Sequence, residues 1–126
     1  MIEGACHCGA ISWRFHVTPA SLTDCNCSYC RRAHALWAYA MRGEIELAYA
    51  PAEVVRYIHG DRQLAFVSCR TCGCTTHWEP LLADGETRND AADVRMAVNM
   101  RMAGPEALEH VTVRRFDGAD SWRFLD

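Results

Sequence analysis

Apolar and polar residues alternate in short runs along most of this chain, the pattern typical of half-buried β-strands. In Ala10–Val17, for example, Trp13 and Phe15 are separated by a polar neighbour, and Pro19 lies just beyond the run. Further strands are predicted at Leu36–Met41, Ile45–Tyr49, Val54–Ile58, Leu64–Val67, Thr75–Trp78 and Val94–Met100. The sequence therefore predicts a mainly β fold.

Helical signals are few and short. Ser28–Ala33 is predicted to form one or two turns with Ser28 as its N-cap, and Pro105–Leu108 is predicted to start a second short helix. Residues 80–93 are mostly polar and are predicted to be an exposed connection. The chain contains no repeat and no linker, so we predict a single domain over residues 1–126.

Composition and charge narrow the function classes. The net charge of -3 is mild and no basic run occurs, which argues against a nucleic-acid partner. The N-terminal residues lack the basic and apolar regions of a secretory signal, and no stretch approaches the roughly 18 consecutive apolar residues of a membrane span. We therefore predict a cytoplasmic protein with no membrane partner, in a compartment where thiols stay reduced.

The candidate chemistry lies in the cysteines. Seven of the eight cysteines form three clusters, which are Cys6 with Cys8, then Cys25, Cys27 and Cys30, and then Cys69 with Cys72. Thiols two or three positions apart suit a shared metal ion, and zinc is the first expectation because it favours thiolate ligands. Disulfides and an iron–sulfur cluster are the alternatives.

The first and third clusters are predicted to form one closed site. Cys69 and Cys72 resemble a zinc knuckle, which needs a second pair of ligands, and Cys6 and Cys8 supply it if the middle cluster acts as a unit. Such a structural site links metal binding to folding by about 10 kcal/mol or more. His7 is predicted to point away from the metal, because we expect residues 6–8 to be extended.

The middle cluster is predicted to form an open site. Cys25, Cys27 and Cys30 supply three thiolates, and a zinc ion with an exchangeable fourth position is typical of a catalytic centre. In the alternative, Cys74 or His77 closes the fourth position. Cys74 buried as a small apolar residue is the more ordinary outcome for that thiol.

Taken in order, segments 4–9, 25–32 and 68–73 resemble the glutathione-dependent formaldehyde-activating family, which shares a domain with the centromere protein V group. The resemblance extends over residues 3–115 and includes a late strand at 98–101. It implies a tent-like zinc-binding β fold with short helical turns. In that fold the ligands of the structural zinc are Cys6, Cys8, Cys69 and Cys72, and those of the second, catalytic zinc are Cys25, Cys27 and Cys30.

The resemblance also implies an activity. The family joins formaldehyde to glutathione and is classed with carbon–sulfur lyases, so the expected substrates are a glutathione-like thiol and a small aldehyde. This chain departs from the family pattern at Cys74, where a small uncharged residue is common, and at His34-Ala35, where a glycine is common. A non-catalytic zinc module that binds a thiol peptide or a protein is the alternative.

Several side chains are candidates for substrate contacts. Arginine offers a bidentate fork for carboxylates, and the candidates for this role are Arg31, Arg32, Arg70 and Arg101. His34 or His77 could carry the proton. Trp37, Tyr39 and Trp78 are candidates to line a pocket, although aromatic residues in strands are commonly core. Ordinary solvated charge is the alternative for each arginine.

Overall fold

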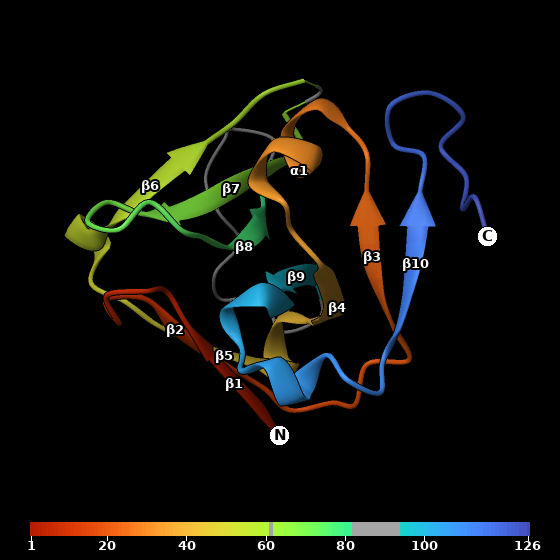
Figure 1. Ribbon diagram of the computed structural model, residues 1–126. Coiled ribbons are helices and arrows are strands. Elements are labelled where there is room, and N and C mark those ends of the chain that lie inside the picture. Colours follow the sequence, from red (N-terminus) through yellow and green to blue (C-terminus); the bar gives the residue numbers. More distant parts are fainter. Residues whose placement is uncertain (61, 82–93) are drawn as a thin grey trace.

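The computed structural model describes residues 1–60, 62–81 and 94–126, and its strands form two sheets (Figure 1). The strands are β1 (Ile2–Ala5), β2 (Ser12–Phe15), β3 (Ser21–Cys25), β4 (Trp37–Met41), β5 (Ile45–Ala48), β6 (Val54–Tyr57), β7 (Leu64–Cys69), β8 (Thr75–Pro80), β9 (Arg95–Asn99) and β10 (Thr112–Phe116). One sheet has the strand order β1-β2-β5, and the other has the order β10-β3-β4-β9-β8-β7-β6. The helical segments are α1 (Ser28–Ala33) and 3₁₀ turns at Arg42–Glu44, Pro51–Glu53, Met100–Met102 and Pro105–Ala107. The predicted mainly β fold is confirmed.

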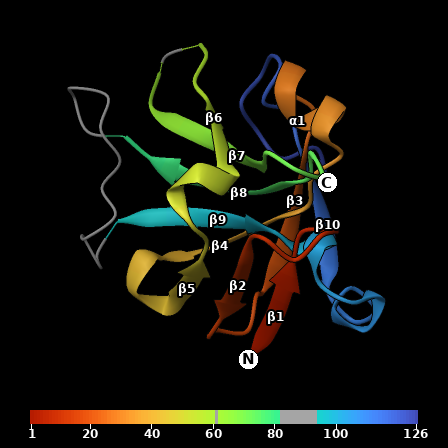
Figure 2. The ribbon, with the colours of Figure 1, turned by 90° about the vertical axis from the view of Figure 1, so that its left-hand side faces the viewer.

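The small sheet covers one end of the large sheet, and the main core lies between them. Figure 2 shows β1 and β2 below β9, β8 and β7. Trp13 and Phe15 of β2 are at most 1% exposed, as their alternation predicts, and they pack with Leu22, Ala38 and Val98 of the large sheet. Because burying apolar surface is the main favourable term in folding, this shared core holds the two sheets together.

The sequence located most strands but missed three of them. The predicted runs correspond to β2 and to β4 through β9; β7 and β8 extend two residues beyond their predicted ends, and the other five strands are shorter than predicted. The missed strands are β1, β3 and β10, which are short and carry no clear run of alternating apolar residues. β10 pairs in parallel with β3, from which it is distant in the sequence, so only the tertiary structure brings the two together (Figure 1). In the predicted connection at residues 80–93, Pro80 ends β8, and residues 82–93 lie outside the described residues.

A buried polar network occupies the interior of β8. His77 is fully buried, with Nδ1 2.8 Å from Thr76 Oγ1 and Nε2 3.1 Å from Glu79 Oε1, so the hydrogen bond to the carboxylate requires the proton on Nε2. Glu79 also accepts a hydrogen bond from the Tyr49 hydroxyl at 2.8 Å and pairs with Arg56 at 3.4 Å. Burial lowers the pKa of His77. Burial is the largest single effect on the pKa of Glu79 and would raise it, but the interactions with His77, Tyr49 and Arg56 together outweigh burial and lower this pKa to about 2.

Replacing the buried carboxylate is expected to destabilise the protein in a pH-dependent way. Glu79→Gln should lower the free energy of unfolding by about 3 kcal/mol at pH 7, because it removes a buried carboxylate that His77, Tyr49 and the partly exposed Arg56 all contact. The carboxyl pKa lies near 2 in the fold against an ordinary 4.5, so its stabilisation is complete above pH 4.5 and is lost as the pH falls towards 2. Urea unfolding at several pH values measures this. Glu109→Gln, at an exposed carboxylate, is the control, and a Glu79 effect independent of pH would contradict the prediction.

None of the helices within the described residues is long and apolar enough to span a membrane.

Candidate metal centres

The first cluster joins two turns that are far apart in the sequence. Cys6 and Cys8 follow β1, whereas Cys69 ends β7 and Cys72 lies in the turn after it. The four Sγ atoms lie within 4.8 Å of one another, with Cys8 Sγ 3.8 Å from Cys6 Sγ and 3.5 Å from Cys69 Sγ. Four sulfurs bound to one zinc ion at ~2.3 Å would stand about 3.8 Å apart, so the cluster fits a tetrahedral metal site.

Glycines shape both turns of this cluster. Gly9 and Gly73 have φ values of 85° and 81°, a conformation that other residues rarely adopt. Their backbone N–H groups donate to the Cys6 carbonyl at 3.0 Å and the Cys69 carbonyl at 2.9 Å. The N–H of Ile11 donates to Cys6 Sγ at 3.3 Å. The glycines therefore close the two turns, and the N–H of Ile11 orients the Cys6 sulfur as a ligand.

Cys74 and His7 lie beside the first cluster but outside its ligand group. Cys74 packs with the core cluster that contains Cys6 and Cys69, and its backbone N–H lowers the pKa of Cys72 to about 5. The backbone N–H of His7 donates to the Cys74 thiol. Residues 6–8 form a turn, so the extended geometry predicted for His7 was wrong, although this residue stays outside the ligand group in the described part of the chain.

The second cluster surrounds the start of α1. Cys25 ends β3, Cys27 is the N-cap of α1, and Cys30 lies one turn into the helix. Their Sγ atoms lie within 4.8 Å of one another. Cys27 Sγ accepts a hydrogen bond from the Cys30 N–H at 3.4 Å, so this thiol is the helix cap and the predicted cap, Ser28, was wrong. The Trp37 indole N–H donates to Cys30 Sγ at 3.3 Å and orients that sulfur.

Cys25 and Cys30 of the second cluster shift each other's pKa values in opposite directions. The hydrogen bond from Cys30 lowers the pKa of Cys25 to about 6, and the same bond raises the pKa of Cys30. Within the described residues, neither Cys74 nor His77 joins this group, because the first lies at the other cluster and the second lies in the buried network of β8. A group of three sulfur donors is typical of a metal site that keeps one coordination position open.

The C-terminal segment completes the second cluster. The Asn26 side chain donates to Asp117 Oδ1 at 3.0 Å and accepts from the Ala119 N–H at 3.0 Å. The backbone N–H of Gly118 donates to the Cys25 thiol. A Cβ atom at Gly118 would lie 2.6 Å from Cys25 Sγ, so only glycine permits this approach. Figure 1 shows the C-terminal segment looping back beside the end of β3.

Adding a methyl group at this contact should weaken the second metal site. Gly118→Ala is expected to lower metal affinity at the second cluster by roughly 10- to 100-fold, because it displaces a sulfur ligand or removes its hydrogen-bond donor. Competition with a chromophoric chelator measures the affinity of each site. Ala119→Gly, which adds no atom to the same loop, is the control. Unchanged affinity in Gly118→Ala would contradict the assignment of this loop to the site.

A cavity of about 470 Å³ adjoins the second cluster, and all three of its thiols form part of the wall. Ten further residues line this cavity, and they are Thr23, Trp37, Tyr39, Leu64, Phe66, Trp78, Arg95, Phe116, Trp122 and Phe124. The three aromatic residues that the sequence suggested for a pocket are among them. The volume falls in the range of small-molecule sites, so the cluster faces a space that can hold a small organic ligand.

Comparison with known proteins identifies the family. A family model described as glutathione-dependent formaldehyde-activating enzyme matches residues 1–109. The chain belongs to this family. A crystal structure of a Rhodobacter sphaeroides protein is also similar, with a TM-score of 0.66 and 27% sequence identity, over 89% of this chain and 99% of that chain. No curated protein matches the chain.

The match to the glutathione-dependent formaldehyde-activating family contains both cysteine clusters but ends before β10. Residues 110–126 nevertheless place Gly118 against the second cluster and three aromatic side chains in the cavity wall. The tail was missed at the sequence level because the contact depends on the parallel pairing of β10 with β3. No local motif in the tail indicates that contact.

Four of the residues predicted to bind substrate group around α1. Arg31 and Arg32 lie in the helix, and Arg32 Nη1 donates to the Ser28 carbonyl at 2.7 Å. His34 is the C-cap of α1 and has a left-handed backbone conformation. Arg101 Nε donates to the carbonyl of His34 at 2.7 Å. Two of these arginines therefore hold backbone carbonyls of the helix or its cap.

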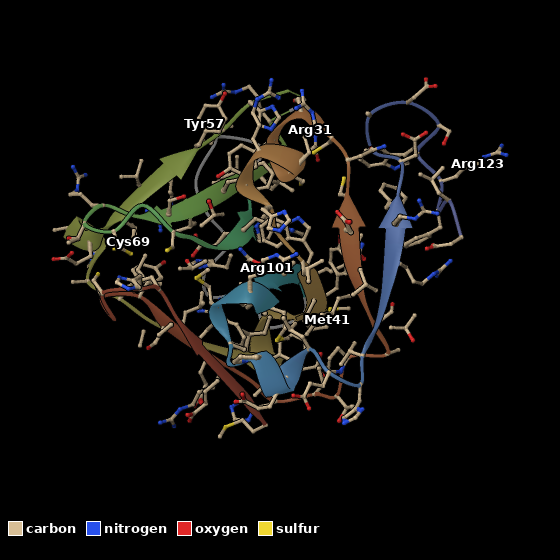
Figure 3. The ribbon with its side chains drawn as sticks, viewed as in Figure 1. Arg31, Met41, Tyr57, Cys69, Arg101 and Arg123 are labelled. Atoms are coloured by element: carbon tan, nitrogen blue, oxygen red, sulfur yellow. The ribbon has the colours of Figure 1, made fainter. Side chains whose placement is uncertain are left out.

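The fifth predicted residue, Arg70, lies beside the first cluster. It follows Cys69 directly, and its Nε donates to the Ala52 carbonyl at 3.0 Å. Figure 3 shows Cys69 well apart from Arg31. Among the described residues that line the cavity, none is one of the five predicted substrate-binding residues. Their role in substrate binding stays a prediction. Arg95, which does line the cavity, could not be found from the sequence, because no motif surrounds it.

Proposed function

We propose that this protein catalyses the addition of a small thiol to formaldehyde or another small aldehyde, with zinc in both cysteine clusters. The observation that carries the proposal is the three-thiol cluster in the wall of a ligand-sized cavity, in a chain of this family. The four-thiol cluster has the role of a structural site, because its ligands come from two distant turns. We also propose one cytoplasmic domain over residues 1–126, since free clustered thiols suit a reducing compartment.

The reaction requires one bond to form and one proton to move. The thiol sulfur bonds to the carbonyl carbon, the π electron pair of the carbonyl moves to oxygen, and the thiol proton ends on that oxygen. Zinc held at the second cluster supplies an open coordination position that favours the thiolate form of an incoming thiol. Trp37 and the backbone of Gly118 hold the ligand sulfurs in place, and the aromatic walls exclude water from the thiol.

Exchange NMR tests this function directly. At equilibrium, free glutathione and S-hydroxymethylglutathione give separate signals, and the exchange between them reports the rate of adduct formation. Zinc-loaded protein is expected to accelerate the exchange in proportion to its concentration, and protein stripped with a chelator is expected to lose the effect. Exchange equal to the spontaneous rate at every protein concentration would overturn the assignment of glutathione and formaldehyde as substrates.

A further inference from the structure

The cavity beside the second cluster has an unusual balance of charge and apolar surface. Its wall is largely aromatic, with side chains such as Phe66, Phe116 and Trp122. Among the residues that the structure describes there, Arg95 is the one charged side chain, apart from the thiols. A ligand in this space therefore meets aromatic faces on several sides and, among the described residues, one cation.

Arg95 is oriented by an aromatic ring, and no carboxylate of the described residues pairs with it. Its guanidinium carbon lies 4.1 Å from the centroid of the Tyr39 ring, a cation–π contact that orients the group beside the cavity. Arg14, Arg56 and Arg115 each pair with a carboxylate. Arg95 has no such pair within residues 1–60, 62–81 and 94–126. Its guanidinium can therefore accept a carboxylate from a ligand.

Glutathione matches this lining poorly. It carries two carboxylates, an ammonium group and two amides, and each of these costs free energy if it is buried without a partner. Inside the cavity, the described side chains that could donate to the carboxylates and amides are the Arg95 guanidinium, the hydroxyls of Thr23 and Tyr39, and the indole N–H groups of Trp78 and Trp122. The described lining contains no carboxylate that could pair with the ammonium group. The volume of about 470 Å³ suits one aromatic ring with short substituents at least as well as a charged tripeptide.

We propose that the thiol substrate of this site is a small aryl or arylalkyl thiol that carries one carboxylate. The inference rests on the proposed function, because it assigns the thiol used at the second cluster. The ring packs among the aromatic walls, the carboxylate pairs with Arg95, and the sulfur faces Cys25, Cys27 and Cys30. In the addition to formaldehyde, this sulfur bonds to the carbonyl carbon and the thiol proton ends on the carbonyl oxygen.

Binding tests this assignment independently of catalysis. Zinc-loaded protein is titrated with 4-(mercaptomethyl)benzoate, with its neutral analogue 4-methylbenzyl thiol, and with glutathione, without aldehyde. Quenching of tryptophan fluorescence gives the affinities, since Trp37, Trp78 and Trp122 line the cavity. The benzoate is expected to bind roughly tenfold or more tightly than the neutral thiol, because a charge-assisted pair with Arg95 adds to the same ring contacts.

Variants of Arg95 test whether this side chain causes the difference in affinity between the benzoate and the neutral thiol. Arg95→Gln should weaken the benzoate roughly tenfold and leave the neutral thiol within about twofold, while Arg95→Lys should keep part of the preference. Arg123→Gln is the matched control, because this tail arginine lies at the outer edge of the molecule in Figure 3. Equal affinities for the two aryl thiols, or a preference that survives in Arg95→Gln, would overturn the proposal.

The NMR experiment separates this proposal from the function on which it rests. Acceleration with the benzoate thiol exceeding that with glutathione supports both. Acceleration with glutathione alone overturns the proposed substrate class and leaves thiol–aldehyde addition standing. If neither thiol shows accelerated exchange but the benzoate still binds in an Arg95-dependent way, the enzymatic function is overturned and the ligand assignment stands.

Discussion

Cys72→Ala is expected to leave most of the chain unfolded at 25 °C. Cys72 is one of four ligands that tie the turn after β1 to the turn after β7. A structural zinc site contributes about 10–16 kcal/mol to folding, whereas the whole free energy of unfolding of a domain is about 5–15 kcal/mol. Loss of this metal therefore removes a contribution as large as the total stability. Circular dichroism and metal analysis of the purified variant measure the effect.

Cys74→Ala is the matched control for this prediction. Cys74 lies two residues away, packs with the same core and stays outside the group of four ligand sulfurs. Its replacement should leave both metals bound and change the free energy of unfolding by about 1 kcal/mol. If Cys72→Ala folds normally and unfolds only when Cys74 is also replaced, the neighbouring thiol substitutes as ligand and the four-residue assignment is wrong.

Cys27→Ala is expected to have the opposite result, with the fold retained and the activity lost. Its thiol is one of three donors at the second cluster, so the zinc content should fall from about two to about one per chain. The thiol also caps α1, and loss of a cap costs about 0.5–2 kcal/mol, which a folded protein tolerates. Thiol–aldehyde exchange should return to the spontaneous rate. Metal analysis, thermal unfolding and exchange NMR together test this prediction.

A second substitution separates the cap from the metal ligand. Cys27→Ser keeps a side chain that accepts the hydrogen bond from the Cys30 N–H, but it replaces the thiolate by a poor zinc ligand. It should restore the stability lost in Cys27→Ala without restoring the second zinc or the activity. Unfolding of both Cys27 variants to the same degree as Cys72→Ala would contradict the division into a structural and an open site.

The ligands of the two clusters are spaced differently along the chain. This difference explains why Cys72→Ala is expected to unfold the protein and Cys27→Ala is not. The first draws its ligands from turns separated by many residues, so it holds the tertiary structure together. The ligands of the second lie within residues 25–30, so the chain can present these three thiols with little long-range closure. What the tertiary structure adds to the second cluster is its surroundings, including Trp37 and the loop at Gly118.

The sequence by itself determined the mainly β class, most of the strands and the grouping of seven thiols into four and three. These features follow from local rules, since alternation along a strand and the spacing of thiols in a turn are properties of neighbouring residues. Local rules failed where a cap or a turn replaced the expected geometry, as at Cys27 and in residues 6–8.

Only the tertiary structure decided the environment of the second cluster. It placed Cys74 at the first cluster and His77 in a buried network, so the two residues that could have closed the open position lie elsewhere. It also brought the tail against Cys25 and Arg95 into the cavity wall, through the pairing of β10 with β3 and of β9 with β4. Such pairings depend on which distant strands share an edge, and no periodicity within a strand encodes that choice.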